Sequence, residues 1–239
     1  MALQGEIFRA QKGRVTQRII LGDKAYFIKQ HAGVGWREVI KNLLHARLPV
    51  MSARQEWQAI QKITALGVAA PKVVGYGERG CLPATRESFI LMEELAPAIS
   101  LEDLCRHWKQ SPPDFIFKRD LISKVATIAR ILHTHGVNHR DFYICHFLML
   151  QNASANTPLY LIDLHRAELR RKTPARWIIK DLAGLYFSSK DIGLTRHDYY
   201  RFMTLYSNKS LRDVIQTEAL FWQKVKTRGD RLYRDHQKR

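Results

Sequence analysis

The spacing of apolar residues changes once along this 239-residue chain, near residue 95, and that change constrains its fold more than any other feature. Before it, polar turns separate short runs rich in β-branched and aromatic residues, which we interpret as strands at 6–10, 16–21, 25–29, 72–77 and 88–92. After it, apolar residues recur at helical spacing. We therefore expect an α+β fold, with a small antiparallel β-rich lobe over 1–95 and a mainly helical lobe over 96–239.

Helix boundaries can be placed in both parts of the chain. Ser52 followed three residues later by Gln55 is a capping-box pattern, and Gly67 is a typical residue just after a helix end. In the second part, residues 100–109 and 120–135 are expected to be helices. The later one places four apolar side chains on one face, namely Leu121, Val125, Ala129 and Leu132.

The chain carries a strong excess of positive charge. Lys and Arg number 39 against 22 Asp and Glu, which gives a formal net charge of +17. Such a charge attracts phosphates, nucleic acids, anionic lipid surfaces or acidic proteins, and it says little about fold. The three cysteines are too few and too widely spaced for a disulfide framework, and no apolar run reaches the length of a signal peptide or a membrane span. We expect a cytoplasmic protein that can meet a membrane face.

A carboxylate in the first lobe faces an apolar stripe. Glu56 lies four residues before Ile60 and seven before Ile63, on the inward side of the helix that begins near Ser52. A buried carboxylate needs a cation, and Lys29 at the end of a predicted strand is the candidate. A strand lysine paired with a helix glutamate directs the lysine at nucleotide phosphates in kinases. The alternative is that Glu56 reaches past the edge of the stripe into water, and helix geometry alone does not decide between the two.

The tripeptide His139-Arg140-Asp141 follows directly after the helix that Gly136 ends. In the kinase arrangement this aspartate accepts the proton of the substrate hydroxyl, and a metal ligand lies five positions later, here at His146. Three residues alone are weak evidence. A competing interpretation is a zinc site formed by His139, Cys145, His146 and His165, but no CxxC or HxxxH spacing supports it.

Asp163 ends the apolar run "LYLID", which we interpret as a short buried strand. A carboxylate at such a position can bind a Mg²⁺ ion that bridges nucleotide phosphates. Five residues occur in the order, and on the kinds of helix, strand and loop, that a kinase site requires, and this combination rarely arises by chance. It favours a kinase that uses ATP and Mg²⁺. The five residues are Lys29, Glu56, Asp141, His146 and Asp163.

The pattern departs from protein kinases in two places. There is no Gly-x-Gly-x-x-Gly, so basic residues near Gly13 either help to bind phosphate or form a solvated strand face; these are Arg9, Lys12, Arg14 and Arg18. His146 replaces the usual asparagine, and Leu164-His165 follow Asp163 where Phe-Gly is usual. Because a neutral imidazole is a poor ligand for Mg²⁺, His146 either binds the metal weakly or forms a hydrogen bond instead.

Two further segments have both a functional and an ordinary interpretation. The end of the strand at 88–92 is a candidate hinge, in which backbone groups of Glu93 and Leu95 meet the adenine edge and Met92 packs behind it. It is equally consistent with an ordinary strand-to-loop transition. Asp181 would open a helix and accept hydrogen bonds from the loop around Asp141, or it is an acidic residue in a first helical turn.

Several long motifs together resemble the lipopolysaccharide core heptose(I) kinase family of Gram-negative bacteria: "GVNHRDFYICHFLM", "LIDLHRAELR", "RWIIKDLAGLYFSS" and "IGLTRHDYYRF". The similarity runs from about residue 3 to about residue 215, with one departure at Phe142, where the family more often has cysteine. The resemblance implies a protein-kinase-like fold and transfer of the ATP γ-phosphate to the first L-glycero-D-manno-heptose of the inner core. It implies Asp141 as base, Asp163 as the principal Mg²⁺ ligand, and Lys29 with Glu56 as the phosphate-positioning pair.

The resemblance also implies partners. The acceptor would be the lipid A-core glycolipid, met at the cytoplasmic face of the inner membrane, and acyl carrier protein would be an acidic partner. The positive charge of the chain suits both, and the basic runs at 35–47 and 166–177 are candidate docking surfaces or solvated charged faces.

Other functions stay open at this point. One is a kinase of the same fold that acts on another core sugar or on a protein hydroxyl. Another is a catalytically inactive basic scaffold that binds anionic lipid or acyl carrier protein. Nucleic-acid binding rests on charge alone, since no motif supports it, and we expect none.

Overall fold

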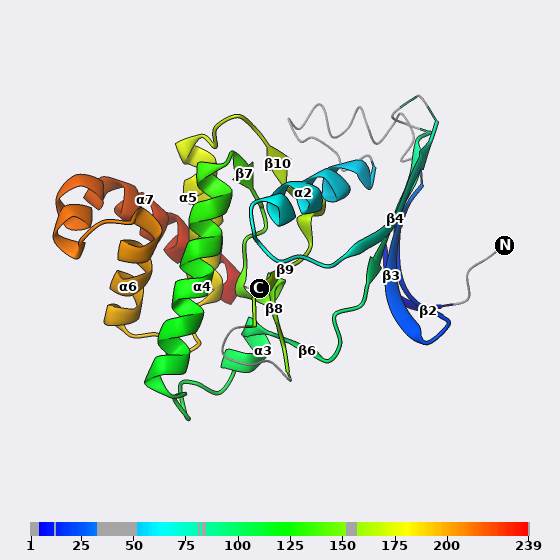
Figure 1. The fold of residues 1–239 in the computed structure, drawn as a ribbon. Coiled ribbons are helices and arrows are strands. Elements are labelled where there is room, and N and C mark those ends of the chain that lie inside the picture. Colours follow the sequence, from blue (N-terminus) through cyan, green and yellow to red (C-terminus); the bar gives the residue numbers. More distant parts are fainter. Residues whose placement is uncertain are drawn as a thin grey trace. The chain divides into compact units, whose positions relative to one another are not determined.

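The computed structural model of the chain describes residues 5–11, 13–32, 52–80, 82, 85–151 and 157–238 (Figure 1). The chain divides into two compact units. The first unit comprises Met1–Thr64, Ala70–Ala96 and Asp163–Arg166, and the second comprises Ala65–Ala69, Pro97–Ile162 and Ala167–Arg239. The short segment that begins at Asp163 thus belongs to the N-terminal unit, although the sequence places it well beyond residue 95.

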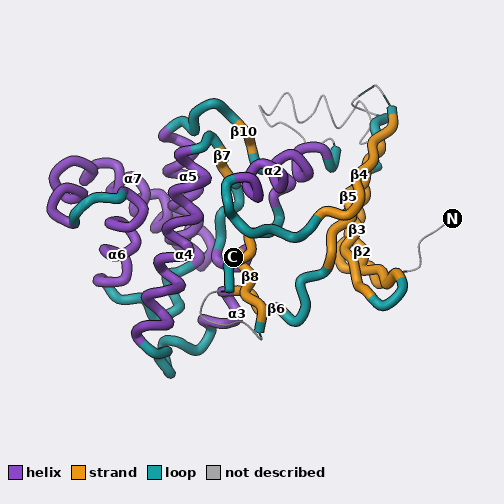
Figure 2. Tube along the Cα trace, in the orientation of Figure 1, coloured by secondary structure: helices purple, strands orange, loops and turns teal. Residues whose placement is uncertain are grey.

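The first unit is built on a five-stranded antiparallel sheet with the order β1-β2-β3-β5-β4 (Figure 2). Its strands are β1 (Glu6–Gln11), β2 (Arg14–Leu21), β3 (Lys24–His31), β4 (Val73–Arg79) and β5 (Glu87–Glu93). The turn between β2 and β3 uses Gly22 at φ +65°, a conformation that favours glycine. The five strands overlap the five runs predicted from the sequence, and each extends one or two residues further at one or both ends, while β4 begins one residue later than predicted.

Helix α2 (Arg54–Ala65) lies in the first unit except for its last residue. At its start, the Ser52 hydroxyl accepts a hydrogen bond from the Arg54 amide at 3.2 Å. Beyond its end lies Gly67, at φ +80°. A ring stack and a hydrogen bond are among the contacts that join this part of the chain to the sheet. The Trp57 ring stacks on Tyr76 of β4 with centroids 4.6 Å apart, and the Ala53 amide donates to the Ser88 hydroxyl of β5.

The second unit consists mainly of helices, drawn in purple in Figure 2. They are α3 (Leu101–Cys105), α4 (Phe115–Thr134), α5 (Ala175–Ser188), α6 (Arg196–Ser207) and α7 (Leu211–Gln237). Helix α4 packs along α6, and α5 packs along α7. The predicted apolar face of α4 is confirmed, because Leu121, Val125, Ala129 and Leu132 are all buried.

Two helix boundaries differ from the prediction. The helix expected at 100–109 ends at Cys105 and continues as turns. Helix α4 begins at Phe115 rather than residue 120, because the Asp114 carboxylate accepts hydrogen bonds from the Ile116 and Phe117 amides at 2.8 and 3.0 Å. A side-chain cap of this kind satisfies amides that a new helix leaves without partners.

Two small antiparallel sheets complete the second unit. One pairs β7 (Val137–Asn138) with β10 (Glu168–Leu169), and the other has the order β6-β8-β9. The bounds of the latter are β6 (Ala98–Ser100), β8 (Phe147–Leu150) and β9 (Tyr160–Leu161). The strand predicted to end at Asp163 is therefore shorter and ends at Leu161. Residues 139–146 lie between β7 and β8 and contain one 3₁₀ turn, η1 (Ile144–His146).

Among the described residues, no helix has both the length and the apolar character needed to cross a membrane.

Candidate functional site

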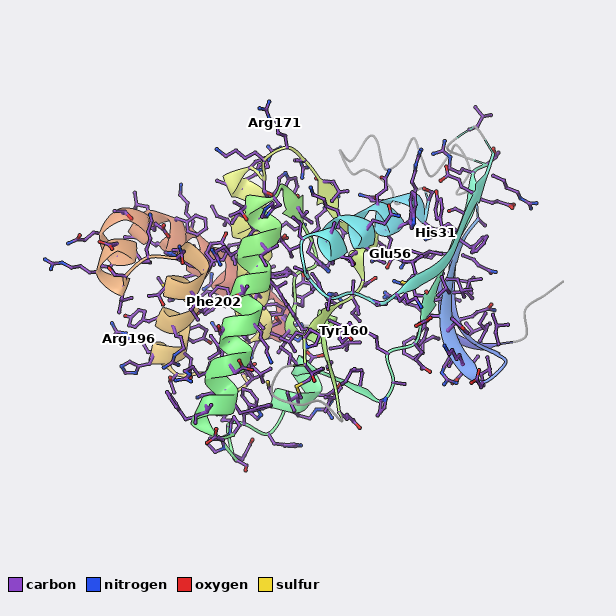
Figure 3. All side chains as sticks on the ribbon, viewed as in Figure 1. His31, Glu56, Tyr160, Arg171, Arg196 and Phe202 are labelled. Carbon is purple, nitrogen blue, oxygen red and sulfur yellow. The ribbon has the colours of Figure 1, made fainter. Side chains whose placement is uncertain are left out.

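Lys29 and Glu56 form a buried ion pair. The Nζ atom of Lys29 on β3 lies 2.5 Å from the Oε1 atom of Glu56 on α2, which is labelled in Figure 3. The Glu56 side chain is 1% exposed, and that of Lys29 is 12% exposed. Glu56 therefore does not reach into water, and of the two sequence-based alternatives the structure contains the ion pair.

Asp163 joins this pair and completes what we call the lysine cluster: Lys29, Glu56 and Asp163. Its Oδ1 atom lies 3.4 Å from Lys29 Nζ, 3.7 Å from an Arg14 nitrogen and 2.5 Å from His165 Nδ1. The Asp163 backbone has φ +61°, which is uncommon for a residue other than glycine. Backbone strain of this kind concentrates at functional sites, where the surroundings hold it in place.

The donor set of the lysine cluster fits Mg²⁺ bound together with nucleotide phosphates. Proteins usually bind Mg²⁺ through one or two carboxylates plus substrate phosphates, and the cluster offers Asp163 next to the cations Lys29 and Arg14. In the part of the chain that the structure describes, no group of three or more His, Cys, Asp or Glu side chains could hold a metal ion by itself. A protein-only zinc site finds no support there.

A neutral histidine lies beside the lysine cluster. His31, at the end of β3 (Figure 3), is 4% exposed and is paired with Arg14 across the β2–β3 ladder. Burial, followed by the positive charge of Arg14, lowers the pKa of His31 to about 4. At neutral pH the imidazole therefore carries no charge.

The second group of candidate residues is the HRD loop, which we define as His139, Arg140 and Asp141. Arg140 has φ +73°, a strained conformation for an arginine. The fully buried carboxylate of Asp181 accepts hydrogen bonds from the amides of His139 at 2.7 Å and Arg140 at 2.9 Å. The predicted bracing role of Asp181 is confirmed, but it lies in the middle of α5 rather than at its start.

His146 holds the backbone of Asp141. Its Nδ1 atom lies 2.7 Å from the Asp141 carbonyl oxygen, and the Tyr143 amide donates to the same oxygen at 3.0 Å. Because a carbonyl oxygen can only accept, His146 Nδ1 carries the hydrogen in this contact. The sequence left a metal ligand and a hydrogen-bonding residue as alternatives, and the structure contains the hydrogen bond.

The three members of the HRD loop differ in their surroundings. His139 is fully buried; its Nε2 donates to the Ile162 carbonyl at 2.9 Å and its ring stacks on His146. The Arg140 guanidinium donates to the Glu168 carboxylate at 2.9 Å. Asp141 is half-buried. Burial therefore suits His139 to positioning the loop rather than to contacting a substrate.

The segment predicted as a hinge follows β5. Met92 is buried, and the Glu93 amide donates to the Lys72 carbonyl at 2.9 Å. Leu95 is half-buried, and its amide has no hydrogen-bond partner among the described residues. Glu94 between them forms a two-bond ion pair with Arg18, at 2.8 and 2.7 Å.

The basic residues around Gly13 have different surroundings. Arg18 is engaged with Glu94, which raises the pKa of Arg18 and has its own pKa lowered by the hydrogen bond from Arg18. Arg14 approaches Asp163. Arg9 lies on β1, and Lys12 lies outside the described residues, as does the basic run at 35–47.

Comparison with known proteins decides the family. Residues 1–206 match the sequence model of the family described as "Lipopolysaccharide kinase (Kdo/WaaP) family". This chain belongs to the lipopolysaccharide kinase (Kdo/WaaP) family.

Relatives of this Kdo/WaaP family chain include two proteins named lipopolysaccharide core heptose(I) kinase WaaP. The one from Escherichia coli strain K12 is 47% identical over 233 residues, which span 96% of this chain and 88% of the relative. The one from Pseudomonas aeruginosa strain PAO1 is 47% identical and covers 99% of this chain and 90% of the relative. A solved structure titled "WaaP in complex with acyl carrier protein" matches with a TM-score of 0.83 and 43% identity, covering 97% of this chain and 90% of that one. The expected kinase-like α+β fold and the family resemblance are confirmed.

In this Kdo/WaaP family chain, two residues that contact the HRD loop or its partner Asp181 were not identified from the sequence. Glu168, which accepts from Arg140, has no local signal because its partner lies 28 residues away. His133 is buried 3.5 Å from the Asp181 carboxylate, and its Nδ1 lies 2.9 Å from the Tyr206 hydroxyl. Its position four residues after Ala129 places it on the buried face of α4, and this periodicity was the available signal.

The second unit also contains an apolar cavity of about 430 Å³, which the sequence did not predict. Its lining includes Trp108, Leu121, Leu185, Phe202, Trp222 and Val225, and Phe202 on α6 is labelled in Figure 3.

Proposed function

We propose that this chain transfers the γ-phosphoryl group of ATP to a hydroxyl of the first L-glycero-D-manno-heptose of the lipopolysaccharide inner core. The two relatives named lipopolysaccharide core heptose(I) kinase WaaP, 47% identical over nearly the full length, support the reaction and the acceptor. The observation that carries the proposal is the lysine cluster. A buried lysine–glutamate pair with a strained aspartate beside the lysine is the arrangement that phosphoryl transfer needs for nucleotide phosphates and their metal.

Lys29 would contact the nucleotide phosphates, and Glu56 would hold the lysine extended toward them. Asp163 would hold the Mg²⁺ that accompanies ATP and neutralises charge on the phosphate oxygens. Arg14, 3.7 Å from Asp163, would add a second cation on the phosphate side and so take part of the role of the missing glycine-rich loop. At the other end of the nucleotide, Glu93 and Leu95 would offer backbone groups to adenine, with Met92 packed behind them.

Asp141 would accept the proton of the heptose hydroxyl as that oxygen attacks the γ-phosphorus. The other two HRD residues and His146 would position it. Support comes from the Asp141 carbonyl, which receives two hydrogen bonds, and from the adjacent Arg140 amide, which is held by Asp181. We assign His146 to this positioning role rather than to the metal.

The acceptor is part of the lipid A-core glycolipid, and we propose that the protein works as a peripheral protein at the cytoplasmic face of the inner membrane. The net charge of +17 supports electrostatic docking on an anionic glycolipid surface. We further propose that the two units serve as the N-terminal and C-terminal lobes of one kinase-like domain.

Acyl carrier protein is the second proposed partner. The similar solved structure is WaaP in complex with acyl carrier protein, and the positive charge of this chain suits an acidic protein. The 430 Å³ apolar cavity has the size and lining for an acyl chain such as this carrier bears. A Leu194→Trp change in the cavity wall should remove the gain in affinity that acylation of the carrier gives. Binding of the unacylated carrier should be unchanged.

The activity is tested with purified protein, γ-labelled ATP, Mg²⁺ and core glycolipid that lacks phosphate on its heptoses. We expect label on the first heptose and none on generic protein substrates. Label on another sugar or on protein would favour the alternative acceptors. Binding of the glycolipid without any transfer would favour the inactive scaffold.

A further inference from the structure

We propose that four cations gathered around the indole ring of Trp177 bind an anionic group, a carboxylate or a phosphate, of the acceptor glycolipid. The four are Arg140, Arg170, Arg176 and Lys180, and together with Trp177 we call them the Trp177 cluster. That the ligand is the acceptor rests on the proposed function, while the anion-binding chemistry rests on the cluster itself.

The cluster is compact and draws on three parts of the second unit. The charged ends lie close to the centre of the Trp177 ring, at 5.3 Å for Arg176, 5.5 Å for Arg140 and Lys180, and 5.7 Å for Arg170. Arg140 comes from the HRD loop, Arg170 from the residue after β10, and the other two from the first turns of α5. The negative face of an aromatic ring attracts cations, so one indole holds together charges that would otherwise repel one another.

Positive charge dominates within the cluster. The Glu168 carboxylate contacts two of its members, Arg140 at 2.9 Å and Arg170. Burial, followed by the positive charges of Arg140 and Arg176, lowers the pKa of Arg170. The neighbouring positive charges therefore destabilise the charged form of Arg170, and a bound anion would reduce this repulsion.

The cluster is open to a ligand. Arg176 is exposed, and the next basic residues, Arg171 and Lys172, are exposed as well. Figure 3 shows Arg171 projecting outward from the loop that precedes α5. Helix α5 begins at Ala175, and Pro174 before it provides no side-chain cap, so the positive end of the helix dipole adds positive potential at the same place.

The chemistry of the cluster suits a carboxylate or phosphate better than a generic negative surface. Three of its four cations are arginines, whose planar forks form paired hydrogen bonds with both groups. The cluster is also tied to the catalytic machinery through the chain. Arg140 immediately precedes Asp141, and Lys180 immediately precedes Asp181, which braces the HRD loop. An anion held here would orient the acceptor relative to Asp141.

Binding to core glycolipid in neutral detergent micelles tests this inference without catalysis. The variants are Arg176→Gln and Arg176→Glu, and the matched controls are Arg212→Gln and Arg212→Glu at an exposed position on α7. We expect Arg176→Gln to weaken binding about fivefold, which is the usual contribution of one basic residue near an anionic surface. Arg176→Glu should weaken it further, and both Arg212 variants should bind as the wild type does.

Two modified acceptors identify the anion. One carries methyl esters on its carboxyl groups, and the other lacks its phosphates. The affinity difference between wild type and Arg176→Gln should disappear with the acceptor that has lost the recognised group. Equal binding by wild type and Arg176→Gln would overturn the inference, and so would a difference that persists with both modified acceptors.

Kinetics separate recognition from a purely structural role. Arg176→Gln should raise KM for the glycolipid and leave kcat, KM for ATP and the thermal unfolding midpoint unchanged. A lowered midpoint or kcat with unchanged KM for the glycolipid would mean that Arg176 only braces α5, and would overturn the inference. If the wild type binds the glycolipid in an Arg176-dependent way but transfers no phosphate, the proposed function fails and this inference stands.

Discussion

The lysine cluster and the HRD loop are held in place by different means. In the lysine cluster, side-chain charges hold one another, with Glu56 on Lys29 at 2.5 Å and Asp163 within 3.4 Å of the same nitrogen. In the HRD loop, the backbone is held, because Asp181 accepts from the amides of two successive residues and His146 bonds to the Asp141 carbonyl. One group depends on charge balance and the other on backbone geometry.

The roles proposed for the two groups account for this difference. A lysine that contacts phosphates needs its charge and its direction, and a buried carboxylate supplies both. The proposed general base, Asp141, lies in a loop whose main chain the protein holds in place, which fixes where its carboxylate meets the substrate. Substitutions that change charge should therefore impair the lysine cluster. Substitutions of the side chains that form hydrogen bonds to the main chain should impair the HRD loop.

The largest effect is expected from Lys29→Met. It removes the phosphate contact and leaves Glu56 buried without its cation, so we expect a loss of about 3–5 kcal/mol in unfolding free energy. The rate constant kcat should fall by about a hundredfold or more, as when one charge-stabilising group is removed. Urea unfolding and steady-state kinetics measure the two effects. Lys24→Met, at an exposed position on the same strand, is the control and should change neither.

The double variant Lys29→Met/Glu56→Leu sharpens this point. Replacing both members of a buried ion pair with apolar residues is commonly neutral or stabilising, so the unfolding free energy should return near the wild-type value. Activity should not return. If the double variant is as unstable as the single one, the charge-balance description of the lysine cluster is wrong.

Acid should weaken the first unit through His31. Its pKa is about 4 in the folded protein and near 6.5 when unfolded, so the unfolded state takes up a proton first as the pH falls. The stability associated with neutral His31 is present above pH 6.5 and is lost between pH 6.5 and about 4, by roughly 3 kcal/mol in total. Urea unfolding across this window should show a smaller loss for His31→Gln than for the wild type. Equal losses would contradict the burial of a neutral imidazole.

Asp181→Asn tests the HRD loop without changing side-chain size. The His139 and Arg140 amides bond to different oxygens of the Asp181 carboxylate, so an asparagine, which has one oxygen, can accept from only one of them. Hydrogen bonds to a charged group contribute about 1.5–3 kcal/mol. We expect a loss of stability in that range and a lower kcat, because Asp141 is then less well positioned. KM for ATP should stay the same, since the lysine cluster is intact. A change in KM for ATP with unchanged kcat would argue against the proposed division of roles.

The smallest expected effect is a change in KM for ATP that distinguishes the roles of two arginines on β2. Arg14 approaches Asp163, while Arg18 is committed to Glu94. Arg14→Gln should raise KM for ATP severalfold, whereas Arg18→Gln should leave it nearly unchanged. Steady-state kinetics with varied ATP distinguishes them, and equal effects would mean that Arg14 has no special role at the phosphates.

The sequence predicted the parts of the site that obey local rules. Glu56 lies on an apolar stripe, where a carboxylate requires a cation, and this led to Lys29. The run that ends at Asp163 and the tripeptide around Asp141 could be identified because they follow a strand and a helix in a familiar order. The five strands of the first unit followed from β-branched and aromatic runs separated by polar turns, and the buried face of α4 followed from periodicity.

What the sequence could not supply depends on contacts between distant residues or on side-chain caps. Glu168 and the Trp177 cluster arise when β10 and α5 pack beside the HRD loop. The basic run at 166–177 marked a candidate docking surface, but its local sequence does not show that Arg140 and Lys180 join it. Asp114 starts α4 five residues earlier than periodicity suggested, because a side-chain cap outweighs weak local preference. The hydrogen bond of His146 to Asp141 depends on a 3₁₀ turn that no residue pattern marks.

Mass spectrometry of core glycolipid tests the central claim most directly, that Asp141 serves phosphoryl transfer to the first heptose. The cells would carry as their sole copy either Asp141→Asn or the control Asp235→Asn, an exposed aspartate on α7. We predict glycolipid that lacks phosphate on the first heptose with Asp141→Asn, and the normal phosphorylated mass with Asp235→Asn. Normal phosphorylation with Asp141→Asn would contradict the account.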